Sequence, residues 1–505
     1  MSWFLALPLV IPFAAAILAF LARGAGAGRW ISIVGGIAQV LAAILLLSAV
    51  ATEGVIAGQM GSWPAPFGIT LVADYLSAAM VGVTAVVGLA VSVYALADID
   101  ERLEGLGYHA LYNVLIAGVT GAFLTGDLFN LYVWFEVMLI ASFGLLVLGG
   151  RPEQIDGGVK YVALNLVSTL LFLTAIGVLY GVTGTLNMAD LAQATDSLDP
   201  ALLTLISMLF MIAFGIKAAV FPLFFWLPAS YHTPAFAVSA VFAGLLTKVG
   251  VYALIRTFTL IFDHDAGTTH TVLLWVAGLT MVTGVLGAAA QNEMRKILSF
   301  HIISQIGYMI LGLALLTPLA LAGAVFYIVH HIIVKANLFL IAGVAQRLTG
   351  GEALNRIGGL YKSAPFLAVL FIVPAFSLAG FPPLSGFWAK FLLVRAALEI
   401  EGWVIAGVAL VVGLLTIYSM TKIWAAAFWE PHPAGLAPTL DRLDGRARAA
   451  LLAPIAGLAA LTVVIGLFPE PFVVFAERSA EQLLDPSAYV TAVLGAGDAP
   501  AGAVE

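Results

Sequence analysis

Apolar runs, each about as long as a membrane-crossing helix, follow one another along most of the chain. A helix crosses the hydrocarbon layer in about 20 residues. Of the 505 residues, 62% are apolar and only 10% are charged, too few charges to cover a water-soluble core of this size. The sequence therefore predicts an all-α polytopic membrane protein. The fourteen expected spans are 3–22, 30–50, 71–97, 109–126, 128–149, 160–181, 202–226, 233–258, 271–289, 295–316, 319–345, 364–396, 403–429 and 449–469.

Several kinds of chemistry have no support in the sequence. The chain has no cysteine, which excludes disulfides, thiolate catalysis and Cys-ligated metal or iron–sulfur sites. Phosphate-binding glycine motifs are absent, and no block of Lys and Arg favours nucleic acid. We therefore expect no cofactor and no metal site.

The charged loops predict how the spans are oriented. Loops that follow odd-numbered spans carry thirteen Lys and Arg residues, whereas the opposite side carries only Arg256, Arg395 and Arg478. By the positive-inside rule the odd loops face the cytoplasm, and both termini face out. The apolar N-terminus reads as a first span, not a cleaved signal. Residues 470–495 predict an amphipathic helix on the membrane surface.

Six charged residues fall inside apolar runs. A charge at mid-bilayer costs at least about 2.5–3.5 kcal/mol. These charges could carry out transport, or they could be structural, as ion pairs or as side chains that extend to the membrane interface. For Lys422, which lies near a helix end, the two explanations are equally good. These residues are Glu136, Lys217, Lys248, Lys335, Lys390 and Lys422.

Lysine is an informative choice at such positions. A desolvated lysine can release its proton near neutral pH, whereas arginine stays charged. A nearby carboxylate favours the charged lysine, so making and breaking a Glu–Lys pair would load and release a proton. Glu136 and Lys217 are the candidates for this pair.

The span at 319–345 adds histidines. Tyr327, His331 and Lys335 recur every four residues and share one helix face, with His330 one step round. The two histidines could simply be buried residues that hydrogen-bond to main-chain carbonyls. A relay of titratable groups explains the stripe better. A metal or haem site at His330 and His331 is disfavoured, because neighbours on a helix diverge by about 100°.

Two spans contain predicted breaks. Pro222 and Pro228 follow Lys217 in one half of the chain, and Pro382 and Pro383 precede Lys390 in the other. Proline removes a helix hydrogen bond, and irregular backbone in a bilayer marks a cavity or buried site. Interrupted spans in both halves are typical of transporters.

The wording around the first break resembles a known family. Phe-Gly-Ile-Lys-Ala-Ala-Val-Phe-Pro-Leu-Phe-Phe-Trp-Leu-Pro at 214–228, Ala-Ser-Tyr-His-Thr-Pro at 229–234 and Ala-Gly-Leu-Leu-Thr-Lys-Val-Gly-Val-Tyr at 243–252 carry the likeness. They resemble the proton-translocating antiporter-like subunits shared by respiratory complex I and Mrp-type Na⁺/H⁺ antiporters. Chain length and Lys390 are most similar to the D-type Mrp subunits.

This resemblance implies an architecture and a path. It implies fourteen helices with two inverted five-helix repeats at 109–262 and 263–430, preceded by three helices in 1–108. A last helix and an amphipathic segment fill 431–505. The family pattern maps a proton pathway onto Glu136, Lys217, Lys248, His330, His331, Lys335 and Lys390. Whether Tyr327 takes part stays open.

Three functions fit this pattern. The leading one is proton transfer within a multisubunit Na⁺/H⁺ antiporter of a prokaryotic plasma membrane, which implies other antiporter subunits as partners. The rival is a proton-pumping subunit of a complex I-type oxidoreductase or membrane hydrogenase. The third function, a stand-alone permease, is disfavoured, because a permease needs one binding site and the lysines inside the spans form a series. Only Glu136 is a deep acid, so the Na⁺ path is expected mainly in another subunit.

Overall fold

The computed structural model describes residues 3–264, 266–435, 439–440 and 443–495. Within them, twelve helices are long and apolar enough to cross a membrane. The chain is therefore an all-α polytopic membrane protein, as predicted. These helices are α1 (Trp3–Leu21), α2 (Gly28–Glu53), α3 (Tyr75–Asp98), α6 (Leu128–Val147), α7 (Pro152–Thr183), α9 (Pro200–Ala218), α11 with α12 (Phe236–Leu260), α13 (Ala266–Ala290), α14 (Met294–Leu315), α15 (Pro318–Thr349), α19 (Trp403–Trp424) and α20 (Gly445–Leu467).

Two expected spans differ from these twelve. The span at 109–126 is the shorter apolar helix α5 (Tyr108–Leu124), and the span at 364–396 is divided into α17 (Pro365–Ala379) and α18 (Ser385–Glu399). The number fourteen stays a prediction. Two boundaries were wrong by eight residues: α7 begins at Pro152, and α9 ends at Ala218, where the break begins. The main-chain nitrogen of Arg151, just before α7, donates to the Gln154 side chain and so caps the first turn.

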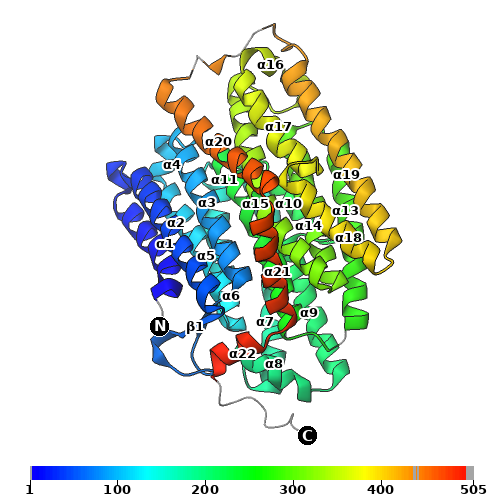
Figure 1. Ribbon diagram of the computed structural model, residues 1–505. Coiled ribbons are helices and arrows are strands. Elements are labelled where there is room, and N and C mark those ends of the chain that lie inside the picture. Colours follow the sequence, from blue (N-terminus) through cyan, green and yellow to red (C-terminus); the bar gives the residue numbers. More distant parts are fainter. Residues whose placement is uncertain (1–2, 265, 436–438, 441–442, 496–505) are drawn as a thin grey trace.

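The connections between the long helices lie at the two opposite ends of the bundle (Figure 1). The short helices α4 (Glu101–Gly105) and α16 (Leu360–Ser363) lie at one end, whereas α8 (Met188–Ala194) and α22 (Ser487–Leu494) lie at the other. A two-stranded hairpin of β1 (Ile56–Gln59) and β2 (Thr70–Ala73) belongs to the second end. The loops thus alternate as the charge count predicts. Which end faces the cytoplasm stays a prediction.

Three helices form the centre of the bundle. Almost every residue of α12 (Thr247–Leu260), α14 and α15 is buried, in contrast to the half-exposed outer helices. These three carry most of the charged and titratable residues that the sequence places inside spans. Their burial leaves those residues only one another, the main chain and enclosed water as partners.

Both predicted breaks are present. Helix α9 ends at Ala218 and its continuation, α10 (Trp226–Ser230), begins after an irregular stretch that contains Pro222. Helix α17 is followed by Gly380, which has a φ of 93°, and Pro382 and Pro383 fill the gap before α18. Pro228 is not part of a break, because it lies in the first turn of α10, where proline is tolerated.

The C-terminal segment corrects another expectation. The amphipathic helix exists as α21 (Glu470–Leu484), with Ala476, Ala480 and Leu483 buried along one face. It does not lie across the end of the bundle, as a helix on the membrane surface would. Instead it packs lengthwise against α15 and α3 (Figure 1).

Candidate functional site

Glu136 and Lys217 mark one side of the site, but they do not touch. Glu136, on α6, accepts a 2.7 Å hydrogen bond from the Thr169 hydroxyl of α7. No carboxylate oxygen of Glu136 lies within 4.0 Å of the Lys217 amino group, the limit for an ion pair. The Lys217 Nζ lies instead 5.6 Å from the ring centre of Phe135. The pair that the sequence suggested is therefore open in this structure.

A small cavity adjoins the Lys217 side chain. It measures about 10 Å³, enough for about one water molecule. Tyr161 and Asn165 from α7 line it, together with Trp226 and Leu246. The cavity therefore lies between the Lys217 side chain and Leu246, the last residue of the turn that precedes Lys248.

Helix α12 approaches the end of α9 very closely. A Cβ atom on Gly250 would lie 2.5 Å from the main-chain nitrogen of Ala218 and 2.8 Å from the carbonyl carbon of Lys217. Only glycine permits this contact. The packing holds the break in α9 beside the helix that carries Lys248.

Lys248 lies directly after an irregular turn. Residues Phe242–Leu246 form a π-helical turn, which leaves main-chain carbonyls outside the regular helical pattern. The fully buried Lys248 Nζ donates to one of them, the carbonyl oxygen of Ala243, at 2.6 Å. No charged partner is needed to hold this amine in place.

Helix α15 brings His331 and Lys335 to the same region. Lys335 Nζ donates to the Leu298 carbonyl of α14 at 3.1 Å. His331 is fully buried, and neither ring nitrogen has a hydrogen-bond partner in the protein. The charges of Lys248 and Lys335 both act on this ring. His331 is therefore close enough to both lysines to be influenced by their charges.

His301 was missed in the sequence. It lies on α14, is fully buried, and has two ring nitrogens without partners, as His331 does. The positive charges of Lys335 and Lys390 both act on its ring. The available signal was a titratable residue inside an apolar run, the same signal that identified Lys248.

His330 belongs to a separate hydrogen-bonded group near the second break. Its Nδ1 lies 2.8 Å from the Ser385 hydroxyl, which lies 3.0 Å from the Ser377 hydroxyl. A Cβ atom on Gly386 would overlap the Ser377 carbonyl oxygen and press on the His330 ring. The α17–α18 break therefore packs against α15 through a glycine.

Lys390 ends the line on α18. Its Nζ donates to the carbonyl oxygen of Ala379, the last residue of α17, at 2.9 Å, and lies 5.1 Å from the Tyr308 ring centre. Tyr327 stacks on Tyr308 with ring centres 5.2 Å apart, and its hydroxyl donates to Gln305. The Tyr327 ring thus packs near both His330 and His331, while its hydroxyl donates a hydrogen bond to Gln305.

Lys422 and Arg256 lie outside this line. Lys422 donates to the carbonyls of Ala289 and Gln291 at the end of α13, which supports the structural alternative for this residue. Arg256 was expected in a loop, but it lies inside α12 and is 4% exposed. It forms a 2.6 Å ion pair with Asp74, which is 2% exposed.

A polar vestibule opens at the end of the bundle near α10. His232, Lys296 and Glu153 are among the residues that line a space of about 630 Å³. Burial lowers the pKa of His232 below its usual range, and the nearby Lys296 and Arg295 lower it further. His232 is therefore neutral at pH 7, as an acceptor beside a polar opening should be.

Taken as chemistry, the buried residues form a line and not a pocket for a solute. Amines and imidazoles follow one another from α9 through α12, α15 and α14 to α18, with a broken helix at each end. Such groups can pass a proton along, and none of them is arranged to bind a larger molecule. The fold and site define an ion-translocating membrane subunit.

Comparisons with known proteins agree with this class. Residues 125–416 match the family described as NADH:quinone oxidoreductase/Mrp antiporter, transmembrane. The chain belongs to this family.

Relatives of the whole chain are also found. The D subunit of the Na(+)/H(+) antiporter of Alkalihalophilus pseudofirmus is 48% identical over 97% of this chain and 98% of that protein. A chain in the structure of the Mrp complex from Dietzia sp. DQ12-45-1b superposes with a TM-score of 0.90 at 34% identity, over 98% of this chain and all of that one. A chain of the archaeal membrane-bound sulfane sulfur reductase has a TM-score of 0.91 at 25% identity, over 98% and 100% of the two chains.

Proposed function

We propose that this chain is the proton-translocating subunit of a multisubunit Na⁺/H⁺ antiporter in a bacterial plasma membrane. The observation that carries the proposal is the buried line itself. His301 and His331 have four ring nitrogens without protein partners, placed between lysines that donate only to main-chain carbonyls. A relay needs groups that can both take and give a proton, and these can.

Similarity favours the antiporter over the respiratory rival. A relative named for Na⁺/H⁺ antiport is 48% identical, whereas the chain from the sulfane sulfur reductase shares the fold at 25%. The role is that of a transporter subunit, working with partner subunits that supply the Na⁺ path. Supporting this division, Asp74 and Glu104, the deeply buried acids outside the line, are held by Arg256 and Arg29.

Transport by lysine variants tests the line. In everted vesicles that contain the whole complex, Lys248→Met should lower Na⁺-dependent proton movement by about a hundredfold, the usual size of a lost proton-transfer group. Lys217→Arg should fail as well, since arginine keeps its proton. Lys362→Met is the matched control, because Lys362 is exposed on the short helix α16 at the end of the bundle.

The outcomes separate scaffold from relay. If an assembled complex with Lys217→Arg transports as well as the wild type, Lys217 holds structure and does not exchange protons. If Lys248→Met behaves like Lys362→Met, the line is not the path.

We propose also that both termini face out. Ser197 follows α8 at one end of the bundle, and Asn355 precedes α16 at the other; both are exposed. Since no native cysteine is present, Ser197→Cys in intact cells should react with an impermeant thiol reagent, and Asn355→Cys should not. The reverse labelling would invert the topology.

A further inference from the structure

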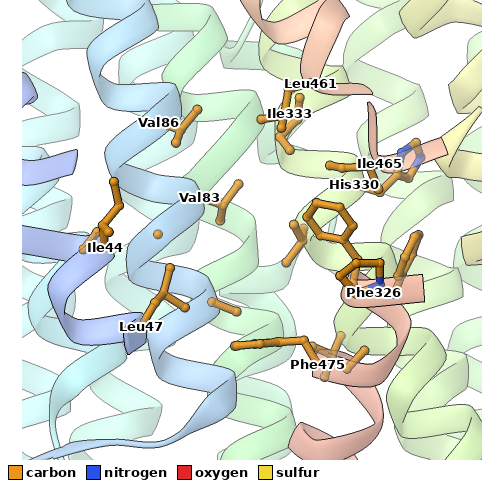
Figure 2. Close-up of a pocket in the computed structure, with 18 of the residues that line it drawn as sticks. Ile44, Leu47, Val83, Val86, Phe326, His330, Ile333, Leu461, Ile465 and Phe475 are labelled. Atoms are coloured by element: carbon orange, nitrogen blue, oxygen red, sulfur yellow. The ribbon is translucent and has the colours of Figure 1, made fainter. Parts of the chain in front are cut away.

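A groove of about 380 Å³ lies beside the line, between α2 and α3 on one side and α15, α20 and α21 on the other (Figure 2). Four of the five helices that line it, α2, α3, α15 and α20, are of membrane-spanning length, and the fifth is the shorter α21. Residues labelled on the α2 and α3 wall are Ile44, Leu47, Val83 and Val86, and on the opposite side Phe326, His330, Ile333, Leu461, Ile465 and Phe475.

The lining shows what kind of molecule fits. Apart from His330, every residue that lines the groove is apolar. One wall reaches the outside of the protein, since Ile44 is 56% exposed. An empty groove would forfeit dispersion contacts on all its walls, and water gains no hydrogen bonds there. A hydrocarbon chain from the surrounding bilayer supplies those contacts.

Filling alone does not select one lipid from another, because lipid tails are as apolar as the groove. Selection needs a polar group at one end, and α21 provides it. The Tyr75 and Phe475 rings, 5.0 Å apart, close the end of the groove. One turn further along α21, the exposed Arg478 donates to the Tyr75 hydroxyl at 3.2 Å. Among the described residues, no carboxylate pairs with Arg478.

The charges around Arg478 are mixed. Glu477 and Glu481 lie beside it on the exposed face of α21. Arginine binds phosphate through charge-assisted hydrogen bonds, and carboxylates attract an ammonium group. A headgroup that carries both a phosphate and an amine matches this patch, whereas a headgroup with only negative charge meets two carboxylates.

We propose that the groove holds one acyl chain of a zwitterionic aminophospholipid, with its phosphate on Arg478 and its amine at Glu477 and Glu481. The chain covers the His330 side of the groove. Resting on the proposed function, this gives the lipid a role: it keeps water from reaching the proton line through the side of the bundle.

Lipid binding can be measured without transport. The purified complex is placed in vesicles of equal parts phosphatidylethanolamine and phosphatidylglycerol, with chain-labelled nitroxide lipid of either kind. Electron paramagnetic resonance then counts immobilised lipid per complex. Val329→Trp from the α15 wall and Gly82→Leu from the α3 wall should each lose one immobilised phosphatidylethanolamine. A Cβ on Gly82 meets only the end of Leu47, at 3.1 Å, so the added side chain has room to enter.

Matched controls lie away from the groove. Val34→Trp places the same ring on a 65% exposed position of α2, and it should change nothing. Unchanged counts in both groove-filling variants would overturn the proposal.

The headgroup has its own test. Arg478→Gln should lose the same lipid, whereas Arg395→Gln, which removes an exposed arginine paired with Glu399, should not. Glu477→Gln with Glu481→Gln should abolish the preference for phosphatidylethanolamine over phosphatidylglycerol. A wild-type complex without that preference, or an Arg478→Gln complex with a full lipid count, would refute the headgroup assignment. Because the count does not depend on antiport, it separates this proposal from the proposed function.

Discussion

The ion pair between Asp74 and Arg256 offers a sharp test of what holds the helices together. Asp74 caps α3: one carboxylate oxygen accepts from the Ser77 main-chain nitrogen at 2.9 Å, and the other faces Arg256 at 2.6 Å. Arg256 lies between the rings of Tyr252 and Tyr489, with its guanidinium carbon 5.5 and 5.2 Å from their centres. One pair thus joins α3, α12 and α22.

The two functions of Asp74 can be separated. Asp74→Asn removes the charge but keeps the cap, since asparagine caps helices as well as aspartate does. It leaves the Arg256 charge buried without a partner, which costs about 3–5 kcal/mol. Asp74→Ala should cost about 0.5–2 kcal/mol more, because the cap is lost too. Arg256→Met leaves the Asp74 carboxylate without its ion-pair partner, but the carboxylate keeps its hydrogen bonds to Ser77. Arg256→Met should therefore lower the stability less than Asp74→Asn does.

The combined variant decides the question. Asp74→Asn with Arg256→Met leaves no buried charge, so it should be more stable than either single variant. The measurement is the apparent melting temperature of the purified complex at one fixed scan rate, because membrane complexes unfold irreversibly. If the losses of the two single changes simply add in the double variant, the residues act independently and the reasoning is refuted.

Two further changes test the line and its packing. His301→Ala should lower antiport as strongly as His331→Ala, measured in everted vesicles with the complex assembled; transport near the wild-type rate would make His301 a packing residue. Gly386→Ala should prevent assembly or stop transport, because its Cβ would overlap the Ser377 carbonyl, whereas Gly407→Ala, with no atom within 4 Å of the new Cβ, should do neither. Equal behaviour of the two glycine variants would show that the α17–α18 contact yields easily.

Much of the fold was accessible from sequence because hydropathy alone identifies membrane helices. The apolar runs predicted the twelve membrane-length helices, and the prolines predicted the two breaks, whereas the short helices α4, α8 and α16 were not predicted. Orientation of single helices was harder. α21 has an amphipathic pattern, and such a pattern fits a membrane surface or a groove between spans equally well. Only packing against α15 decides between them.

The sequence identified candidate charged residues for the site but not the contacts between them. A charge inside an apolar run is expensive, so Lys217, Lys248, Lys335 and Lys390 were evident from sequence. The contacts between these residues could not be predicted, because one sequence does not determine the rotation or depth of a helix. Glu136 and Lys217, for example, do not form the expected pair. Arg256 was misplaced because its partner, Asp74, lies far away in the chain, and proximity between distant segments leaves no trace in one sequence.

The cations of the bundle differ in the kind of partner that holds them. Arginines at Arg29 and Arg256 are paired with buried acids, and arginine keeps its proton, so these charges are permanent fixtures.

Lysines in the centre are held differently. Lys248, Lys335 and Lys390 donate to main-chain carbonyls, at a π-helical turn, on α14 and at the end of α17. A carbonyl is neutral, so a lysine that gives up its proton leaves no opposite charge stranded in the bilayer, the cost that makes breaking a buried ion pair so expensive. In the proposed relay, these neutral acceptors would position each amine without opposing the loss of its proton. Those of Lys248 and Lys390 lie at the π-helical turn and at the end of α17, whereas that of Lys335 lies within α14.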